Sequence, residues 1–179
     1  MDSPEPGFYR LTRFTPLDSF KCSSEPGCDE LQEFLKEDAL PQQLCNVNQT
    51  VLAYIDDVLV GYYALSCHTV QIERAEERSR YGLDETEYAR FPAVLLGRLA
   101  VHDDYRNRGI GKKLLLHAVS RALNVADIVG CRFLIAHAYE HRVSWYERNR
   151  FEVFHRPKSK IELPLVFMRF DLFPVEPQK

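Results

Sequence analysis

The stretch Arg106 to Lys113, RNRGIGKK, combines residue types that bind phosphate. Gly109 and Gly111 lack a Cβ, so an anion can approach the main chain there. The free N–H groups and the dipole of a helix's first turn attract anions, and Arg106, Arg108 and Lys112 add positive charge, with Lys113 expected to be a solvated helix residue. The stretch predicts either a phosphate cradle or a basic turn that binds nothing.

Two common phosphate-binding motifs are absent from this stretch. No G-K-[ST] follows a glycine at the spacing of a P-loop. The spacing is also one glycine short of the dinucleotide-binding fingerprint.

The elements on either side determine where the glycines lie. Residues 93–101, AVLLGRLAV, form a nearly continuous apolar run, which is typical of a central strand buried on both faces. Residues 109–129 place apolar side chains along one stripe of a helix, and Gly130 is suited to end it. The glycines therefore belong to a strand–loop–helix connection.

The remaining pattern alternates strands with helices. A helix is expected over residues 28–40 with Asp29 as its cap, and the segment from Pro41 either breaks it or begins a second helix. Residues 73–92 read as a charged surface connection with a short helical turn. Strands are expected over Phe8–Phe14, on both sides of a turn at Asp56-Asp57, and over residues 132–138, 151–155 and 165–173, with a short helix over 141–149. The prediction is a single α/β (α+β) domain over residues 1–179.

Composition excludes several classes of protein. No apolar run reaches the roughly 18 residues of a membrane span, and the acidic, proline-rich start MDSPEPGFYR is unlike a signal peptide, so we expect a cytoplasmic protein. The five cysteines are an odd number without C-x-x-C spacing, which predicts free thiols, although Cys22 and Cys28 remain candidates for a bridge. His137 and His141 lack the carboxylate pattern of a zinc site, so no metal is expected.

Charge is unevenly distributed along the chain. The net charge is −3, with −8 over residues 1–100 and +5 over residues 101–179. The positive half contains the glycine stretch, so a local basic face for a polyanion is one reading, and an ordinary mixed surface is the other.

The segment LGRLAVHDDYRNRGIGKKLL resembles the acetyl-coenzyme A signature of the GNAT acetyltransferases, [RQ]-x-x-G-x-[GA] after a bulged strand. Arg106, Gly109 and Gly111 match it, and WYERNRF is similar to the family's closing Y-x-x-x-G-F. The resemblance implies a mixed, mostly antiparallel sheet flanked by helices and an N-acetyltransferase that uses acetyl-coenzyme A.

The resemblance also assigns roles to the main chain. Leu99, Ala100 and Val101 would hydrogen-bond the pantetheine arm, with the Val101 N–H polarising the thioester carbonyl. The pyrophosphate would be held by the loop and first helical turn, namely Arg106, Asn107, Arg108, Gly109, Ile110, Gly111 and Lys112.

Tyr146 occupies the position of the family's catalytic acid, where a phenol protonates the leaving thiolate; packing alone is the alternative. Arg150 replaces the family's glycine, so we expect an altered turn after this helix. No general base stands out: His137 has the apolar context of a core histidine, and Glu140 is suited to cap the helix that follows.

A narrower resemblance is to the bacterial toxins that acetylate aminoacyl-tRNA, carried by Phe20-Lys21-Cys22, Leu31, Phe34-Leu35, Gly61-Tyr62-Tyr63 and Tyr146. It implies an aminoacyl-tRNA acceptor, a ribbon-helix-helix antitoxin and candidate phosphate contacts at Arg98, Arg142, Arg148, Arg150, Arg156, Lys158 and Lys160. An acetyltransferase for another primary amine and a non-catalytic acyl-coenzyme A binding module are the alternatives. Edge strands near the C-terminus are candidates for pairing in a homodimer.

Overall fold

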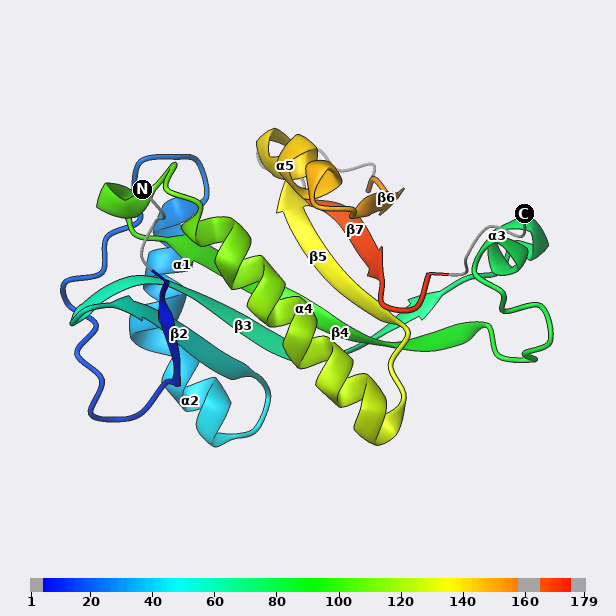
Figure 1. The fold of residues 1–179 in the computed structure, drawn as a ribbon, viewed down its shortest axis with the longest axis horizontal. Coiled ribbons are helices and arrows are strands. Elements are labelled where there is room, and N and C mark those ends of the chain that lie inside the picture. The colour runs from blue at the N-terminus through cyan, green and yellow to red at the C-terminus, as the bar shows by residue number, and fades with distance from the viewer. Residues whose placement is uncertain (1–4, 158–164, 175–179) are drawn as a thin grey trace.

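The computed structural model describes residues 5–157 and 165–174. A seven-stranded sheet with the order β1-β2-β3-β4-β5-β7-β6 runs through the molecule (Figure 1). All neighbouring strands are antiparallel except β4 and β5, which are parallel. The strands are β1 (Gly7–Arg10), β2 (Gln49–Ile55), β3 (Val58–Gln71), β4 (Arg90–Val101), β5 (Phe133–Tyr139), β6 (Glu152–His155) and β7 (Leu165–Asp171).

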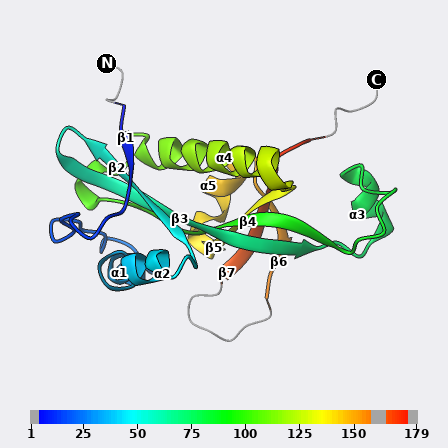
Figure 2. The ribbon, with the colours of Figure 1, turned by 90° about the horizontal axis from the view of Figure 1, so that it is seen from below.

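Helices cover both faces of the sheet (Figure 2). One face carries α1 and α2, which are joined by a π-helical segment, and the other carries α4 and α5. The short helix α3 lies at the far end of the long β3–β4 pair. The helices are α1 (Cys28–Glu33), the π-helical segment (Phe34–Asp38), α2 (Ala39–Leu44), α3 (Ala75–Arg80), α4 (Ile110–Val129) and α5 (Val143–Arg148).

Each face of the sheet has its own hydrophobic core. The apolar stripe of α4, including Leu114, Leu115 and Ala118, is buried together with Tyr146 of α5. On the other face Leu35 packs in a separate cluster with Tyr62. The hydroxyl of Tyr62 also donates to the carbonyl oxygen of Leu31 at 2.5 Å, which ties α1 to the sheet.

The two parallel strands separate at their carboxyl ends. Pairing of β4 with β5 is confined to Ala93–Leu96 opposite Phe133–Ala136. The next residue of β4, Gly97, is extra in the ladder with β3, because Ala64 pairs with Arg98 while Leu65 pairs with Leu96. Such a bulge bends a strand. Beyond it the two strands diverge, and the chain continues from β4 into α4.

Most expected elements are present, including the hairpin at Asp56-Asp57, the short helix in the 73–92 connection and the long helix that ends before Gly130. The first strand is shorter than expected and ends at Arg10, because Thr12 and Thr15 hydrogen-bond each other in a turn. Arg98 is exposed, so the expectation of β4 buried on both faces is wrong at that position.

The first helical region differs from the expectation at both ends. Its N-cap is Gly27 in the left-handed conformation, with φ of 83°, so the prediction of Asp29 as the cap is wrong. Helical structure then passes through the π-helical segment into α2, and Pro41 lies inside the first turn of α2. Because proline has no N–H, the backbone hydrogen bond that this position would otherwise make back into the π-helical segment is missing.

Candidate active site

A cavity of about 340 Å³ fills the opening between the separated ends of β4 and β5. Its β4 wall runs from Leu96 to Val101, and its β5 wall from His137 to Tyr139. The start of α4 lies at one end, while α1 and α5 supply the remaining walls. The cavity therefore extends from the glycine loop to the surroundings of Tyr146.

The main chain of β4 presents free hydrogen-bonding groups to this cavity. The N–H of His102 donates to the Val60 carbonyl at 2.9 Å, so it points toward β3. Backbone direction alternates along a strand, so the N–H of Ala100 also points toward β3, whereas those of Leu99 and Val101 point toward the opening. The open edge can pair with an extended, amide-containing ligand as a further strand would.

The loop after β4 forms a concave cluster of N–H groups. Asn107 and Gly109 have positive φ values of 59° and 78°, which turn successive N–H groups toward one side. The first helical backbone bond runs from Lys113 N–H to the Gly109 carbonyl, so the preceding N–H groups of α4 have no helical acceptor. A Cβ on Gly109 would meet no atom within 4 Å, which shows open space above the loop. These features fit a pyrophosphate.

The side chains of this loop have different environments. Asn107, Gly109, Gly111 and Lys112 line the cavity. Arg108 does not, and its guanidinium lies over the Tyr105 ring at 5.1 Å. Ile110 is buried in the core under α4, so only its main chain is available to a ligand.

Two other cations are held by carboxylates. Lys113 pairs with Glu5 at 2.9 Å, so the expectation of a solvated residue is wrong.

Arg106 Nη1 lies 2.9 Å from Glu25 and Arg106 Nε lies 3.1 Å from Asp103. Its Nη2 also contacts the sulfur atoms of Cys22 at 3.4 Å and Cys28 at 3.0 Å. Although burial opposes ionisation, the Cys28 hydrogen bond and nearby negative charge raise the pKa of Arg106 above its ordinary value.

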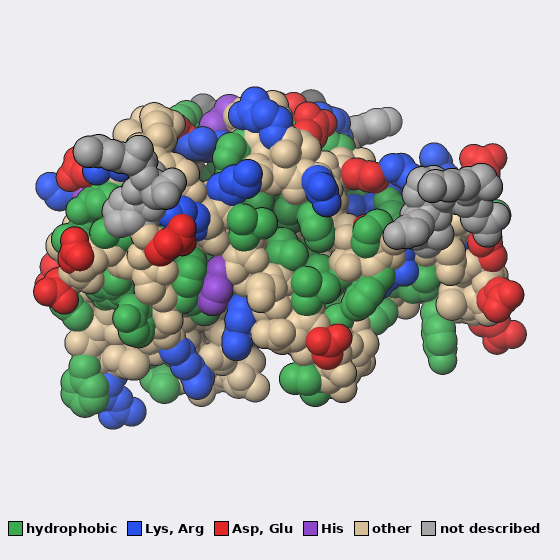
Figure 3. Space-filling model, in the orientation of Figure 1, with side chains coloured by type: hydrophobic (Ala, Val, Ile, Leu, Met, Phe, Trp, Pro, Cys, Tyr) green, Lys and Arg blue, Asp and Glu red, His purple; other side chains and the backbone are tan. Residues whose placement is uncertain are grey.

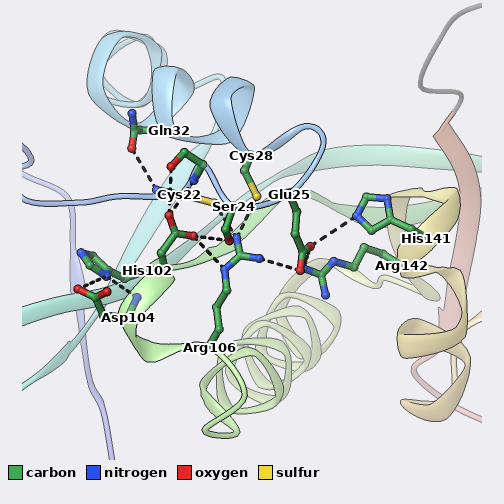
Figure 4. A network of polar contacts seen from close by, with 12 residues as sticks. Cys22, Ser24, Glu25, Cys28, Gln32, His102, Asp104, Arg106, His141 and Arg142 are labelled. Atoms are coloured by element: carbon green, nitrogen blue, oxygen red, sulfur yellow. Dashed lines mark hydrogen bonds and ion pairs between the residues drawn. The ribbon is translucent and has the colours of Figure 1, made fainter.

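Residues 22–28, here called the strap, connect the loop to the opposite wall of the cavity (Figure 4). Ser23 and Ser24 bind the Asp103 carboxylate, and Glu25 extends from Arg106 to Arg142 and His141. Cys22 and Cys28 are buried free thiols, and burial raises the pKa of Cys22 to about 12.

Tyr146 lies on α5, is buried, and is one of the residues that line the cavity. The ring packs against Trp145 at 4.9 Å and Phe151 at 5.2 Å. Burial raises the pKa of Tyr146 to about 12, while the nearby charge of Arg142 opposes the rise. The phenol is therefore protonated at neutral pH and suited to donate a proton.

The turn after α5 retains the backbone that a glycine would give. Arg150 has φ of 69°, in the left-handed region. The Arg150 N–H donates to the carbonyl oxygen of Glu147, and the Phe151 N–H donates to the carbonyl oxygen of Tyr146. The expectation that Arg150 alters this turn is therefore wrong, because the arginine adopts the strained conformation.

The far end of the cavity brings together residues that the sequence pattern did not connect. Glu30 accepts from the Tyr139 hydroxyl at 3.0 Å, and Leu31 and Arg98 lie beside them in the lining. His137 is only half-buried and lines this end too, so it is not simply a core histidine. Burial lowers the pKa of His137, with His68 and Arg98 adding to the effect, which favours a neutral imidazole.

Several remaining predictions can be placed. Glu140 pairs with Arg156 and leaves α5 without a side-chain cap, so its predicted capping role is wrong. Lys158 and Lys160 lie outside the described residues. Among the residues that the structure describes, no group of three or more potential metal ligands is found, and no helix there is long and apolar enough to cross a membrane.

The clustering of the strap with His141 and Arg142 cannot be predicted from the sequence pattern. Their contacts join residues 78 to 117 positions apart, and the segment SSEPGC has only the composition of a turn. The sequence signal for this cluster is the adjacent pair His141-Arg142 at the start of the helix predicted to carry Tyr146.

Comparison with known proteins identifies the family. The model of the acetyltransferase (GNAT) domain matches residues 46–153. The chain is 30% identical over 158 residues to a tRNA-acetylating toxin of Mycobacterium tuberculosis, covering 88% of this chain and 89% of the relative. The chain therefore belongs to the GNAT acetyltransferase family, as the motif predicted.

Solved structures confirm the fold. AtaT complexed with acetyl-methionyl-tRNAfMet superposes with a TM-score of 0.73 at 20% identity, covering 95% of each chain. A mutant AtaT toxin bound to the C-terminus of the antitoxin AtaR and acetyl-CoA gives 0.65 at 22% identity, covering 94% of each chain. The protein is an acetyl-CoA-dependent N-acetyltransferase that moves an acetyl group to a primary amine, and the open β4 edge and N–H cluster fit that co-substrate.

Proposed function

We propose that the acceptor is the amino group of an aminoacyl-tRNA, and that the protein is the toxin of a toxin–antitoxin pair. The observation that carries this proposal is the 30% identity to a tRNA-acetylating toxin over 88% of the chain. Lys and Arg side chains lie at several separate places on the face drawn in Figure 3, interspersed with Asp and Glu. Arg98 and Arg142 line the cavity itself.

The cavity residues have separate roles in this proposal. The peptide groups of Leu99 and Val101 hold the pantetheine arm along the open β4 edge, whereas Ala100, also expected there from the sequence, directs its N–H toward β3. The loop from Arg106 to Lys112 holds the pyrophosphate mainly through its main chain. Acetyl-CoA supplies the acetyl thioester when bound. The Val101 N–H is directed to stabilise negative charge that develops on the acetyl carbonyl oxygen.

Tyr146 is the proposed acid. The acceptor amine attacks the acetyl carbon directly, the carbon–sulfur bond breaks, and the phenol of Tyr146 protonates the departing thiolate. An aminoacyl ester amine has a low enough pKa to need no strong base. The amine is proposed to enter at the far end of the cavity, where neutral His137 can accept the proton that the amine loses.

Residues 1–179 form a single acetyltransferase domain that works in the cytoplasm, where tRNA is charged. A ribbon-helix-helix antitoxin restrains it, by analogy with the AtaT complex that contains an antitoxin C-terminus. Strand β6 is the outer strand at the C-terminal edge of the sheet, opposite β1, and pairs with a second copy in this proposal.

The test is acetyl transfer from labelled acetyl-CoA to charged tRNA, uncharged tRNA and free amines by purified protein. We expect charged tRNA to be labelled and Tyr146→Phe to lower kcat by about 10²- to 10⁴-fold while binding acetyl-CoA normally. Expression should arrest growth with the wild-type chain and not with Tyr146→Phe. Efficient labelling of a free amine together with normal growth would contradict the toxin proposal.

A binding module without catalysis is the remaining alternative. The open cavity around Tyr146 and its neutral phenol favour an enzyme. Binding of acetyl-CoA without transfer to any amine class would support the module instead.

A further inference from the structure

One carboxylate in the strap is contacted by cations from two walls of the cavity (Figure 4). Glu25 Oε1 lies 2.9 Å from Arg106 Nη1. Its Oε2 contacts Arg142 Nη2 and lies 3.6 Å from His141 Nε2. Arg106 belongs to the pyrophosphate loop, whereas His141 and Arg142 follow β5, so Glu25 spans the opening between them.

The strap does not depend on these last two contacts for its position. Ser23 donates to Asp103 through its N–H at 3.0 Å, and the Ser24 hydroxyl does so at 2.8 Å. The Asp103 N–H donates to the Lys21 carbonyl at 2.9 Å, and the Cys22 N–H donates to the Gln32 side chain at 3.0 Å. These hydrogen bonds hold the strap in place, so its position does not require the contact of Glu25 with His141 and Arg142.

The contact lies where a ligand can compete for it. The side chains of Glu25, His141 and Arg142 are 34%, 37% and 40% exposed, and all three residues line the cavity. Ion pairs of this exposure contribute little to stability. An incoming anion can therefore replace Glu25 at small cost, and phosphate is well matched because a guanidinium binds its oxygens in pairs.

We propose that His141 and Arg142 form a binding site for a phosphate of the acceptor, and that Glu25 occupies this site until the acceptor displaces it. The inference rests on the proposed function, since it gives that acceptor its first contact beside the reacting groups. Arg142 is the N-cap residue of α5 and precedes Tyr146 by four residues. A phosphate held there lies about one helical turn from the proposed acid.

The same chemistry could be supplied by a phosphate of acetyl-CoA. The loop at residues 107–111 already offers the N–H groups for the pyrophosphate, and Glu25 approaches from the α1 side together with Glu30 and Leu31. These observations favour the acceptor. Separate KM values for the two substrates distinguish the sources.

Two variants of opposite expected effect test the site. Glu25→Gln removes the competing charge and keeps the shape, so we expect uncharged tRNA to bind about tenfold more tightly. Arg142→Gln removes the phosphate ligand, so we expect it to bind about tenfold more weakly. Glu33→Gln and Arg13→Gln, which change exposed residues outside the cavity, are the matched controls. Binding is measured by fluorescence anisotropy at two salt concentrations.

Kinetics supply the second measurement. For each variant, KM is determined for an aminoacyl-tRNA and for the methyl ester of the same amino acid, which has no phosphate. We expect the ratio of the two KM values, tRNA over ester, to fall in Glu25→Gln and to rise in Arg142→Gln. Thermal unfolding of each variant shows whether it is folded.

Several results would overturn the inference. They are equal changes for tRNA and ester, weaker tRNA binding by folded Glu25→Gln, or a change confined to the KM for acetyl-CoA. Absence of acetyl transfer to any aminoacyl-tRNA by the wild-type protein would instead refute the proposed function. The affinity for uncharged tRNA still tests the phosphate site in that case.

Discussion

The two ends of the cavity bind charge by different means. At the start of α4, peptide N–H groups are arranged by the positive φ values of Asn107 and Gly109. Across the cavity, side chains of the strap and the β5–α5 connection are arranged by ion pairs centred on Arg106 and Glu25. A backbone site depends on conformation, whereas a side-chain site depends on which charges are present and can be exchanged for a ligand.

The largest expected effect comes from placing charge in the backbone site. Gly109→Asp puts a carboxylate beside the proposed pyrophosphate, in a backbone conformation with φ of 78°. We expect affinity for acetyl-CoA to fall by about 100-fold, measured by calorimetry. Gly109→Asn is the control, because asparagine tolerates this conformation without the charge. Equal affinities for the two variants would refute the pyrophosphate assignment.

The next effect comes from breaking the side-chain site. Arg106→Met leaves Glu25 and Asp103 without their shared cation and removes the contacts to both thiols. Because the group is only partly buried, we expect a loss of about 2 kcal/mol in the free energy of unfolding, below the range for fully buried pairs. Urea denaturation measures it. Adding Glu25→Gln and Asp103→Asn should recover part of the loss, and no recovery would contradict the ion-pair account.

Alkaline pH affects the phenols of the cavity but leaves the peptide groups unchanged. Burial raises the pKa of Tyr146 and of Tyr139 to about 12, with Glu30 adding to the rise at Tyr139. An unfolded tyrosine ionises near pH 10, so the unfolded chain loses these protons first. Stability should therefore fall between pH 10 and 12, by up to about 1.4 kcal/mol per pH unit for each group. Tyr146→Phe should reduce the slope measured by urea denaturation.

The smallest effect concerns a single strained residue. Arg150 has φ of 69°, which costs a non-glycine residue about 1 kcal/mol. Arg150→Gly should therefore raise the free energy of unfolding by roughly that amount, measured by thermal and urea unfolding. Arg148→Gly, at a position that ends α5 without positive φ, should lower it. A loss of stability in Arg150→Gly would show that its side chain contributes more than the strain costs.

The sequence was most informative where structure follows from local pattern. The loop could be predicted because it lies between two local patterns that are consecutive in the sequence. These are the apolar run of β4 and the apolar stripe of α4, with the glycines between them. Tyr146 was implied by the resemblance of WYERNRF to the closing motif of the GNAT family. The strap could not be predicted, because Cys28 and Glu25 meet Arg106 and Arg142 only after the sheet has formed. The turn at Arg150 could not be predicted, because the residue type alone does not determine φ.

The extra residue Gly97 in β4 also sets the phase of the strand that follows. Successive peptide groups of a strand point to alternate sides, so one extra residue reverses the side to which each later peptide group points. In the shifted frame, Leu99 and Val101 direct their N–H groups into the cavity and Ala100 does not. Deleting Gly97 would keep every functional side chain in the sequence. The N–H groups of β4 that now point into the cavity would, however, point toward β3 instead.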